Sequence, residues 1–452
     1  MHVPQSPPDD SRAVSAPEPE PVHRRPAARL LSILGPGLIS GAADDCPTGI
    51  ATYAQAGAQA GYGLLWTTLL TLPMLASVQY MASKVAIVRQ QGLAAILKEQ
   101  YPQPLVYAAV LGLIVANVIN AGADIGAMGA AIGMFVPLSV KILVVPIALL
   151  ILLFLVFGNF HVIENTFKWL TLALLGYVVT SFIARPNVGA IIHGTLVPQI
   201  GLSRAFLTLL VATLGGNVSP YLMFWQADLE DDDNRAPDTV VTTSRVAQDV
   251  RLGKYLRMKV NPRQLKETAW DTNVGMIFSN IIIFFIEVSS AETLFTHGKH
   301  HITTAVQAAE ALRPLLGSGA TIMWAIGMLG AGILAVPALT GSIADATASL
   351  FGWGRGLNQA PDKARRFYGV LTVATLVGLG INFLGISPLY ALVISAAVNG
   401  FITPPLLVLL ILVANRKDVM GEYTNGLGLN VVLWATTLIM TAAAAGLLYT
   451  IL

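Results

Sequence analysis

The chain has 452 residues, of which 54% are hydrophobic and only 12% are Asp, Glu, Lys or Arg, whereas roughly a quarter of the residues in an ordinary soluble domain are charged. This composition, with a mean hydropathy of +0.66, excludes a soluble multi-domain enzyme and predicts an all-α polytopic membrane protein. The net charge of +2 gives no reason to expect a nucleic-acid partner, and the one cysteine, Cys46, cannot form an intramolecular disulfide.

The first 28 residues differ in composition from the rest of the chain. They carry seven prolines among Asp, Glu, Ser and Arg, and they lack the apolar stretch of a secretory signal. We expect a disordered cytoplasmic tail over residues 1–28 and a transmembrane transporter domain over residues 29–452.

Apolar runs long enough to cross a bilayer core of about 30 Å recur after this tail. They predict eleven spans, near residues 30–58, 62–88, 104–134, 138–157, 163–184, 203–227, 272–295, 318–350, 366–385, 388–414 and 427–451. Residues 30–184 would form a first repeat, residues 203–414 a second, and residues 427–451 an additional helix. The polar segment 228–270 turns from acidic to basic, which is typical of a solvated connector.

Basic residues are distributed unequally between the short connecting segments. With the N-terminus inside, the cytoplasmic side collects the Lys and Arg of residues 24–29, 84–98, 235–266, 355–366 and 416–417. The opposite side receives few, as the positive-inside rule requires. We therefore expect an integral protein of the cell membrane with a cytoplasmic N-terminus and an outward C-terminus.

Two of the predicted spans are interrupted at matching places. In the first span, Pro47 removes a backbone donor, and two carboxylates, Asp44 and Asp45, fall at membrane depth. The sixth span contains the run Leu214–Tyr221, where Gly and Pro again lie among polar residues. Interrupted segments five spans apart indicate an inverted-repeat transporter whose substrate binds at the midplane between unwound helices.

Polar residues also follow one stripe of the third span. Asn117, Asn120 and Asp124 are spaced i, i+3 and i+7, and interhelical hydrogen bonding explains the asparagines about as well as a permeation path does. Asp124 is more informative, because intramembrane acids are costly. Glu287 and Asp271 lie nearer the ends of the seventh span, and we expect them at the membrane interface.

Three stretches near the start of the chain resemble the first two helices of the NRAMP family of proton-coupled divalent-metal transporters. They are Gly35-Pro-Gly37, Ala51–Tyr62 and Leu64-Leu-Trp66. The resemblance covers essentially the whole chain after residue 30. It implies the LeuT-type fold of that family, with five plus five helices as inverted repeats and an eleventh helix added.

The chain departs from the family at the positions that carry its chemistry. The family's first-helix motif Asp-Pro-Gly-Asn, whose Asp and Asn bind the metal, is replaced by Cys-Pro-Thr-Gly at residues 46–49. The sixth-helix motif Met-Pro-His is replaced by Ser-Pro-Tyr at residues 219–221. The third-helix Asp and Glu that help carry protons match Asn120 and Ala123, with Asp124 next door. The chain resembles a divergent branch of the family.

The residues around the two interruptions leave three hypotheses open. Replacement of the soft and acidic ligands leaves a donor-rich pocket, which favours a small anion such as bicarbonate co-transported with Na⁺. The first alternative is a divalent metal cation, because Asp44 and Asp45 suit hydrated Mg²⁺ or Mn²⁺. The second alternative is a membrane receptor or scaffold that transports nothing.

The candidate residues fall into two groups. The substrate- or ion-binding candidates are Asp44, Asp45, Cys46, Thr48, Gly49, Gly216, Asn217, Ser219 and Tyr221. The candidates for a coupling ion or a pathway are Asn120, Asp124, Thr340, Ser342 and Asp345. Asp45 is a metal ligand only under the divalent alternative. Because the sequence has no P-loop, we expect secondary-active ion transport without a cofactor, with the lipid bilayer and small inorganic ions as the partners.

Overall fold

The computed structural model describes residues 40, 41, 43–157, 174–234, 262–357, 359 and 361–451. These residues contain helices and no strand, and they belong to one packing unit, Gly35–Leu452. The tail expected at residues 1–28, part of the fifth predicted span and most of the connector 228–270 lie outside the described residues.

Twelve of the helices make up the predicted spans. They are α3 (Pro47–Ala60), α4 (Leu65–Arg89), α6 (Gln103–Gly133), α7 (Val140–Phe157), α9 (Leu175–Ile183), α11 (Arg204–Asn217), α12 (Pro220–Asn234), α14 (Pro262–Ser290), α17 (Ala320–Phe351), α18 (Arg365–Ile381), α19 (Pro388–Ala414) and α21 (Leu427–Ile451). The short connecting helices include α5 (Leu93–Gln100), α10 (Val188–Leu196), α15 (Ala305–Ala309), η4 (Glu310–Leu312), α16 (Arg313–Leu316) and α20 (Lys417–Met420). A π-helical segment, η3 (Ala291–Phe295), continues α14.

Seven helical segments within the described residues are long and apolar enough to cross a membrane. They are 103–133, 140–157, 204–230, 262–295, 320–351, 388–414 and 427–451. Other predicted spans are shorter as helices, since α3 has 14 residues and α18 has 17. An integral membrane protein is thus confirmed, while the count of eleven crossings stays a prediction.

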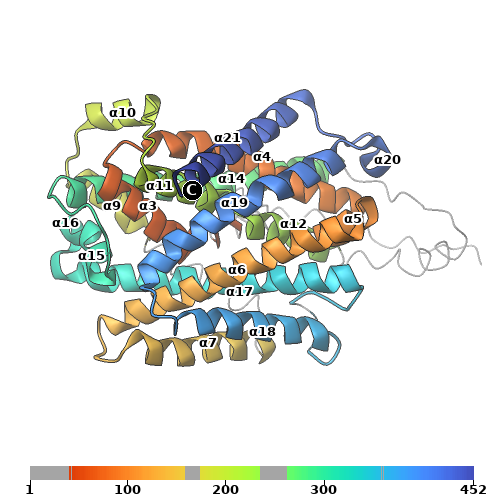
Figure 1. Cartoon of the computed structure of the whole chain (residues 1–452), viewed down its shortest axis with the longest axis horizontal. Coiled ribbons are helices and arrows are strands. Elements are labelled where there is room, and N and C mark those ends of the chain that lie inside the picture. The colour runs from red at the N-terminus through yellow and green to blue at the C-terminus, as the bar shows by residue number, and fades with distance from the viewer. Residues whose placement is uncertain are drawn as a thin grey trace, which may run out of the picture. The chain divides into compact units, whose positions relative to one another are not determined.

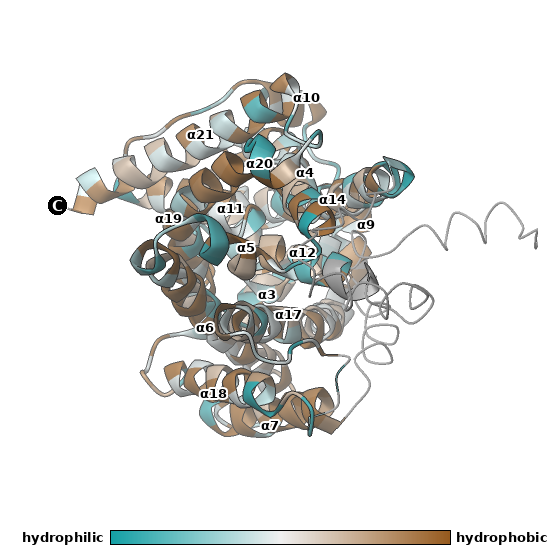
Figure 2. Cartoon of the chain, turned by 90° about the vertical axis from the view of Figure 1, so that its right-hand side faces the viewer, coloured by the Kyte–Doolittle hydropathy of each residue, from teal (hydrophilic) through white to brown (hydrophobic). Residues whose placement is uncertain are grey.

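The short helices gather at two opposite ends of the long ones. Figure 1 shows α10, α15 and α16 at one end and α5 and α20 at the other. Figure 2, seen from the α5 end, shows α3 and α12 at the centre. Helices α4, α6, α14, α17 and α19 pack around these two central helices. Exposed apolar side chains cover α7, α18 and α21, for example Leu153, Val373 and Leu438, as lipid contact requires.

Small residues let several of the helices approach closely. A Cβ added at Gly215 of α11 would lie 2.2 Å from the backbone nitrogen of Gly400 in α19. A Cβ added at Gly122 of α6 would lie 2.3 Å from the carbonyl oxygen of Gly378 in α18. Glycine is required at these contacts because backbones of membrane helices associate through close packing.

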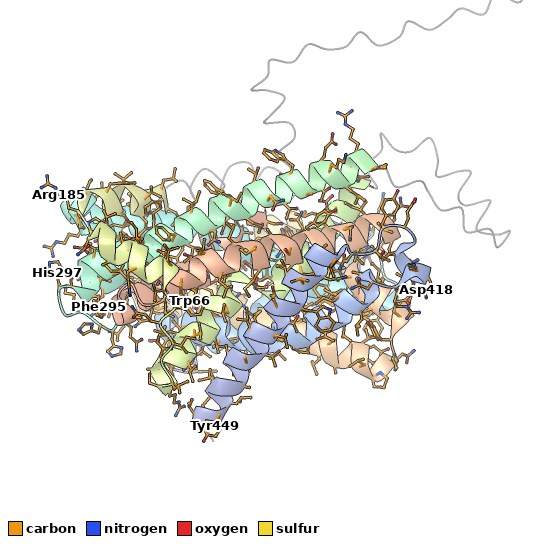
Figure 3. The ribbon with its side chains drawn as sticks, turned by 90° about the horizontal axis from the view of Figure 1, so that it is seen from above. Trp66, Arg185, Phe295, His297, Asp418 and Tyr449 are labelled. Atoms are coloured by element: carbon orange, nitrogen blue, oxygen red, sulfur yellow. The ribbon has the colours of Figure 1, made fainter. Side chains whose placement is uncertain are left out.

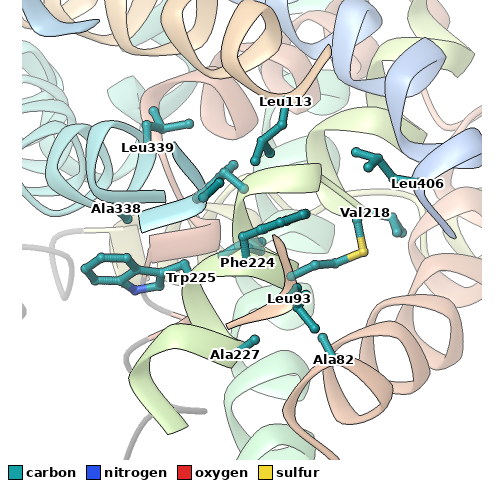
Figure 4. Close-up of a cluster of buried hydrophobic side chains, with 14 of the residues drawn as sticks. Ala82, Leu93, Leu113, Val218, Phe224, Trp225, Ala227, Ala338, Leu339 and Leu406 are labelled. Atoms are coloured by element: carbon teal, nitrogen blue, oxygen red, sulfur yellow. The ribbon is translucent and has the colours of Figure 1, made fainter. Parts of the chain in front are cut away.

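Apolar side chains fill the space around α12, between the interruption of the sixth span and the α5 end. Phe224 and Trp225 of α12 are 1% and 3% exposed and pack with side chains from α4, α5, α6, α17 and α19 (Figure 4). We call this cluster the α12 plug; its members include Ala82, Leu93, Leu113, Val218, Phe224, Trp225, Ala338, Leu339 and Leu406. The α12 plug thus fills the α5 side of the sixth-span interruption with buried apolar side chains.

Candidate functional site

The first predicted span is broken where the sequence places Pro47. Asp44 ends a helical stretch, Asp45 and Cys46 are non-helical, and α3 begins at Pro47. Cys46 is the N-cap of α3, with extended backbone and with its Sγ accepting a hydrogen bond from the Gly49 N–H at 3.4 Å. Because proline has no backbone N–H, Pro47 at the first position of α3 leaves no backbone donor without a partner there.

The sixth span is interrupted between Asn217, where α11 ends, and Pro220, where α12 begins. The Asn217 Nδ2 donates to the hydroxyl of Thr71 in α4 at 2.8 Å. The Asn217 Oδ1 and the Ser219 Oγ are buried without a hydrogen-bond partner. Gly216 lies against α19, where an added Cβ would be 3.6 Å from the nearest atom.

The two broken spans are joined by a reciprocal pair of tyrosine hydrogen bonds. The Tyr53 hydroxyl of α3 donates to the carbonyl of Thr213 in α11 at 2.9 Å. The Tyr221 hydroxyl of α12 donates to the carbonyl of Ala43, just before the first break, at 2.8 Å. Each second half thus bonds to the first half of the other span, so the two interruptions lie side by side.

Asp44 and Asp45 converge on one hydroxyl group. The Ser279 Oγ of α14 lies 2.7 Å from the Asp44 Oδ2 and 3.0 Å from the Asp45 Oδ1. A serine hydroxyl has one proton to donate, so it serves one carboxylate at a time. Neighbouring residues on a helix point about 100° apart; the non-helical backbone at Asp45 lets both side chains, each 1% exposed, reach the same point.

A second polar group surrounds the start of α3. The Asp124 Oδ1 of α6 accepts from the backbone N–H of Thr48 at 3.0 Å and lies 2.8 Å from its hydroxyl. The Thr48 hydroxyl also contacts the Asn120 Oδ1, which accepts from Ser395 of α19 at 3.2 Å. The third residue of the stripe, Asn117, donates to a carbonyl of α17 at 3.5 Å. Interhelical hydrogen bonding is therefore one role that this stripe fulfils.

The three candidates on α17 have different surroundings. The Thr340 hydroxyl donates to a carbonyl of its own helix at 2.8 Å. The Ser342 hydroxyl lies 2.7 Å from a carbonyl of its own helix and 3.2 Å from the Tyr221 carbonyl. Asp345 is buried, with 5% of its surface exposed. Ser342 thus contacts the broken sixth span directly.

Sequence reasoning missed two residues that the structure places in these groups. Ser279 comes from α14 and Ser395 from α19, each more than 200 residues after the residues that it contacts, which are Asp44 and Asp45 for Ser279 and Asn120 for Ser395. A weak signal was present for Ser279, because it forms a polar pair with Asn280 inside an apolar run. Ser395 lies in an apolar stretch where a serine is unremarkable in sequence.

The donor-rich pocket expected for bicarbonate does not form at the first break. Of the backbone N–H groups at the start of α3, that of Thr48 is bonded to Asp124 and that of Gly49 to Cys46. Buried carboxylates lie next to these donors, and negative charge at this position disfavours a second anion. The first break therefore offers an anion neither the Thr48 nor the Gly49 backbone donor.

We expect Thr48→Val to destabilise the protein by about 1–3 kcal/mol, because the substitution removes the hydroxyl from the buried Asn120 and Asp124. Thermal unfolding in detergent measures the change. Thr48→Ser should unfold like the wild type, and so should Thr372→Val, which removes a hydroxyl that bonds only to its own helix. Equal midpoints for Thr48→Val and the wild type would contradict this role.

Interrupted helices that meet at the centre of a helical bundle define a membrane transporter of the LeuT type. The fold is similar to the manganese transporter of Eremococcus coleocola, with a TM-score of 0.68 at 16% identity over 96% of this chain and 88% of that one. It is also similar to Mhp1, a nucleobase-cation-symport-1 family transporter, with a TM-score of 0.57 at 13% identity over 92% and 91%. The predicted fold class is confirmed.

A family model described as natural resistance-associated macrophage protein-like, Nramp, matches residues 37–450, and the chain belongs to this family. One relative is the divalent metal cation transporter MntH of Yersinia pestis (strain Pestoides F), 24% identical over 413 residues, which are 89% of this chain and 91% of the relative. Another is the protein of the same name from Pectobacterium carotovorum, 25% identical over 406 residues, 88% and 89% of the two chains.

Proposed function

We propose that this chain is a secondary-active transporter of divalent metal cations, and that Mn²⁺ and Mg²⁺ are the cations its site suits. The observation that carries the proposal is the convergence of Asp44 and Asp45 on the Ser279 hydroxyl, at a helix break shielded from water. The names of the relatives, divalent metal cation transporter and manganese transporter, support it. A divalent cation thereby takes the place of bicarbonate, co-transported with Na⁺, as the favoured substrate.

The ligand chemistry of this point is that of a hard cation. Carboxylate and hydroxyl oxygens suit Mg²⁺ and Mn²⁺, and Mg²⁺ is bound through one or two carboxylates while it keeps much of its water. The Asp44 Oδ1 is buried without a hydrogen-bond partner. A divalent cation between the two carboxylates would satisfy this atom and offset the repulsion of adjacent buried negative charges.

We infer that residues 30–184 and 203–414 are the two repeats, residues 427–451 an added helix, and that the N-terminus is cytoplasmic in a cell membrane. Added Cβ atoms at Gly41 and Gly57 would lie 2.4 Å and 2.3 Å from the carbonyls of Gly275 and Glu287. The first and seventh spans therefore run in the same direction. The first and seventh spans must be parallel in this way if each of the five spans between them crosses the membrane once.

Transport by the purified chain in liposomes tests the proposed function. We expect saturable uptake of Mn²⁺ down its gradient, with Mg²⁺ competing, because both ions accept the same oxygen ligands. Uptake should not require Na⁺. Uptake of bicarbonate that depends on Na⁺, together with no uptake of either divalent cation, would return the protein to the anion hypothesis. Absence of flux and counterflow for every ion would favour a receptor or scaffold.

A further inference from the structure

A third acidic position lies outside the two polar groups described above. Glu287 of α14 has none of its surface exposed, and neither of its carboxyl oxygens has a hydrogen-bond partner. The expectation that Glu287 lies at the membrane interface is therefore wrong, and Asp271, 3% exposed, is buried as well. The interfacial expectation failed because α14 starts at Pro262, before the predicted start at residue 272, and because α3 packs against the turn that carries Glu287.

The backbone of α3 lies directly against the backbone of α14 at Glu287. An added Cβ at Gly57 would lie 2.3 Å from the backbone carbonyl oxygen of Glu287 and 3.0 Å from the Ser290 Cβ. Tyr53, one turn earlier on α3, donates its hydroxyl to the Thr213 carbonyl instead. Glycine at position 57 thus lets α3 exclude water from this turn of α14.

The elements packed against α14 bring few ionisable side chains to this region. They are Tyr53 from α3, Tyr177 from α9, Glu292 from η3, Glu310 from η4 and, on α4, Tyr80, Lys84 and Arg89. The basic residues of α4 lie in its last two turns, where Lys84 donates to Asn425 at 2.5 Å. Within the described part of the chain, no cation pairs with Glu287.

A buried carboxylate without a partner is strongly disfavoured, whereas a neutral carboxylic acid is tolerated. The smallest ligand that neutralises a lone buried carboxyl group is a proton. A dehydrated Mg²⁺ or Ca²⁺ ion would demand several oxygen ligands. The packing around Glu287 therefore accommodates the protonated acid.

The helix changes its geometry immediately after this turn. The π-helical segment η3 begins at Ala291, and π-helical turns are frequent at functional sites. The Tyr62 hydroxyl, in the link between α3 and α4, donates to the Glu292 Oε2 at 2.6 Å and so ties this link to η3. Figure 3 shows Phe295 and His297 at the end of the molecule opposite Asp418.

We propose that Glu287 is a proton-binding site on the η3 side of the metal site, and that it links metal transport to a proton. Glu287 lies eight residues after Ser279, a rise of about 12 Å along the helix. When α3 and η3 separate, water reaches the carboxylate and a proton binds to one of its oxygens. When they close as seen here, the neutral acid is buried. This inference rests on the proposed transport of divalent cations.

The matched variants for the test are Glu287→Gln and Glu267→Gln. Gln is nearly isosteric with the protonated acid, so Glu287→Gln should fold. Glu267→Gln is the control, because Glu267 lies on the same helix in an exposed ion pair with Arg263. In infrared difference spectra, we expect a carbonyl band of a protonated carboxyl group in the wild type and in Glu267→Gln, and its loss in Glu287→Gln. Glu287→Asp should shift this band and keep it.

The same variants are compared for Mn²⁺ uptake with and without an acidic exterior. We expect an acidic exterior to accelerate uptake by the wild type, Glu267→Gln and Glu287→Asp, and to leave downhill uptake by Glu287→Gln unchanged. A Glu287→Gln protein that keeps the full acceleration, or that keeps the carboxyl band, would overturn the proton site. If the wild type transports no divalent cation, the proposed function fails. The infrared band alone then decides whether the Glu287 carboxyl group is protonated.

Discussion

Asp45→Asn is expected to weaken Mn²⁺ binding by about 10- to 100-fold. The substitution replaces one of two carboxylates that converge on the Ser279 hydroxyl with a neutral amide of the same shape. A charge-assisted interaction is worth about 1.5–3 kcal/mol, and each 1.4 kcal/mol corresponds to about a factor of ten in affinity. Isothermal titration of the purified protein with Mn²⁺ measures the loss.

The matched control is Asp418→Asn, which removes an exposed carboxylate paired with Arg416 in the short helix α20. Its affinity for Mn²⁺ should equal that of the wild type, since Figure 3 shows Asp418 at one extreme end of the molecule. If Asp45→Asn binds Mn²⁺ as tightly as the control, the metal site does not include this carboxylate. Asp44→Asn then tests whether the neighbouring acid alone holds the cation.

Gly215→Ala is expected to destabilise the protein by at least about 1–3 kcal/mol, the usual cost of overpacking a close contact. The added methyl group would lie 2.2 Å from the Gly400 nitrogen and 2.4 Å from the Ala396 carbonyl oxygen. Both atoms belong to the backbone of α19, so α11 and α19 must separate. A lower midpoint of thermal unfolding in detergent would report the effect.

Gly369→Ala supplies the comparison, because nothing lies within 4 Å of a Cβ added at this exposed position of α18. Alanine is favoured over glycine in a helix by about 1 kcal/mol, so this variant should unfold at or slightly above the wild-type midpoint. An unchanged midpoint for Gly215→Ala would mean that the two helices can move apart without cost. The close contact would then not stabilise the fold.

Local chemistry in the sequence predicted the positions of both helix breaks. Pro47 and Pro220 lack a backbone donor, and each begins a new helix in the structure. The burial of Asp44 and Asp45 also followed from their place within an apolar run. These features depend on residues adjacent in the chain, and sequence reasoning is strongest at that range.

Features that depend on packing between distant helices were not predictable in the same way. Ser279 contacts Asp45, and Ser395 contacts Asn120, only because α14 lies beside α3 and α19 lies beside α6. The burial of Glu287 depends on the packing of α3 against α14, which approach closely at Gly57. The occupation of the Thr48 and Gly49 backbone donors by Asp124 and Cys46, which counts against an anion at the first break, likewise needs the folded geometry.

The α12 plug has a consequence for the way in which an ion leaves toward the α5 end. Phe224, Trp225 and Leu93 present no charged surface to replace the hydration shell of a cation. An apolar constriction excludes ions by dewetting even when it is somewhat wider than the ion itself. A small displacement of α12 would therefore not let the metal ion pass. Only a movement large enough to admit a continuous column of water would release the ion.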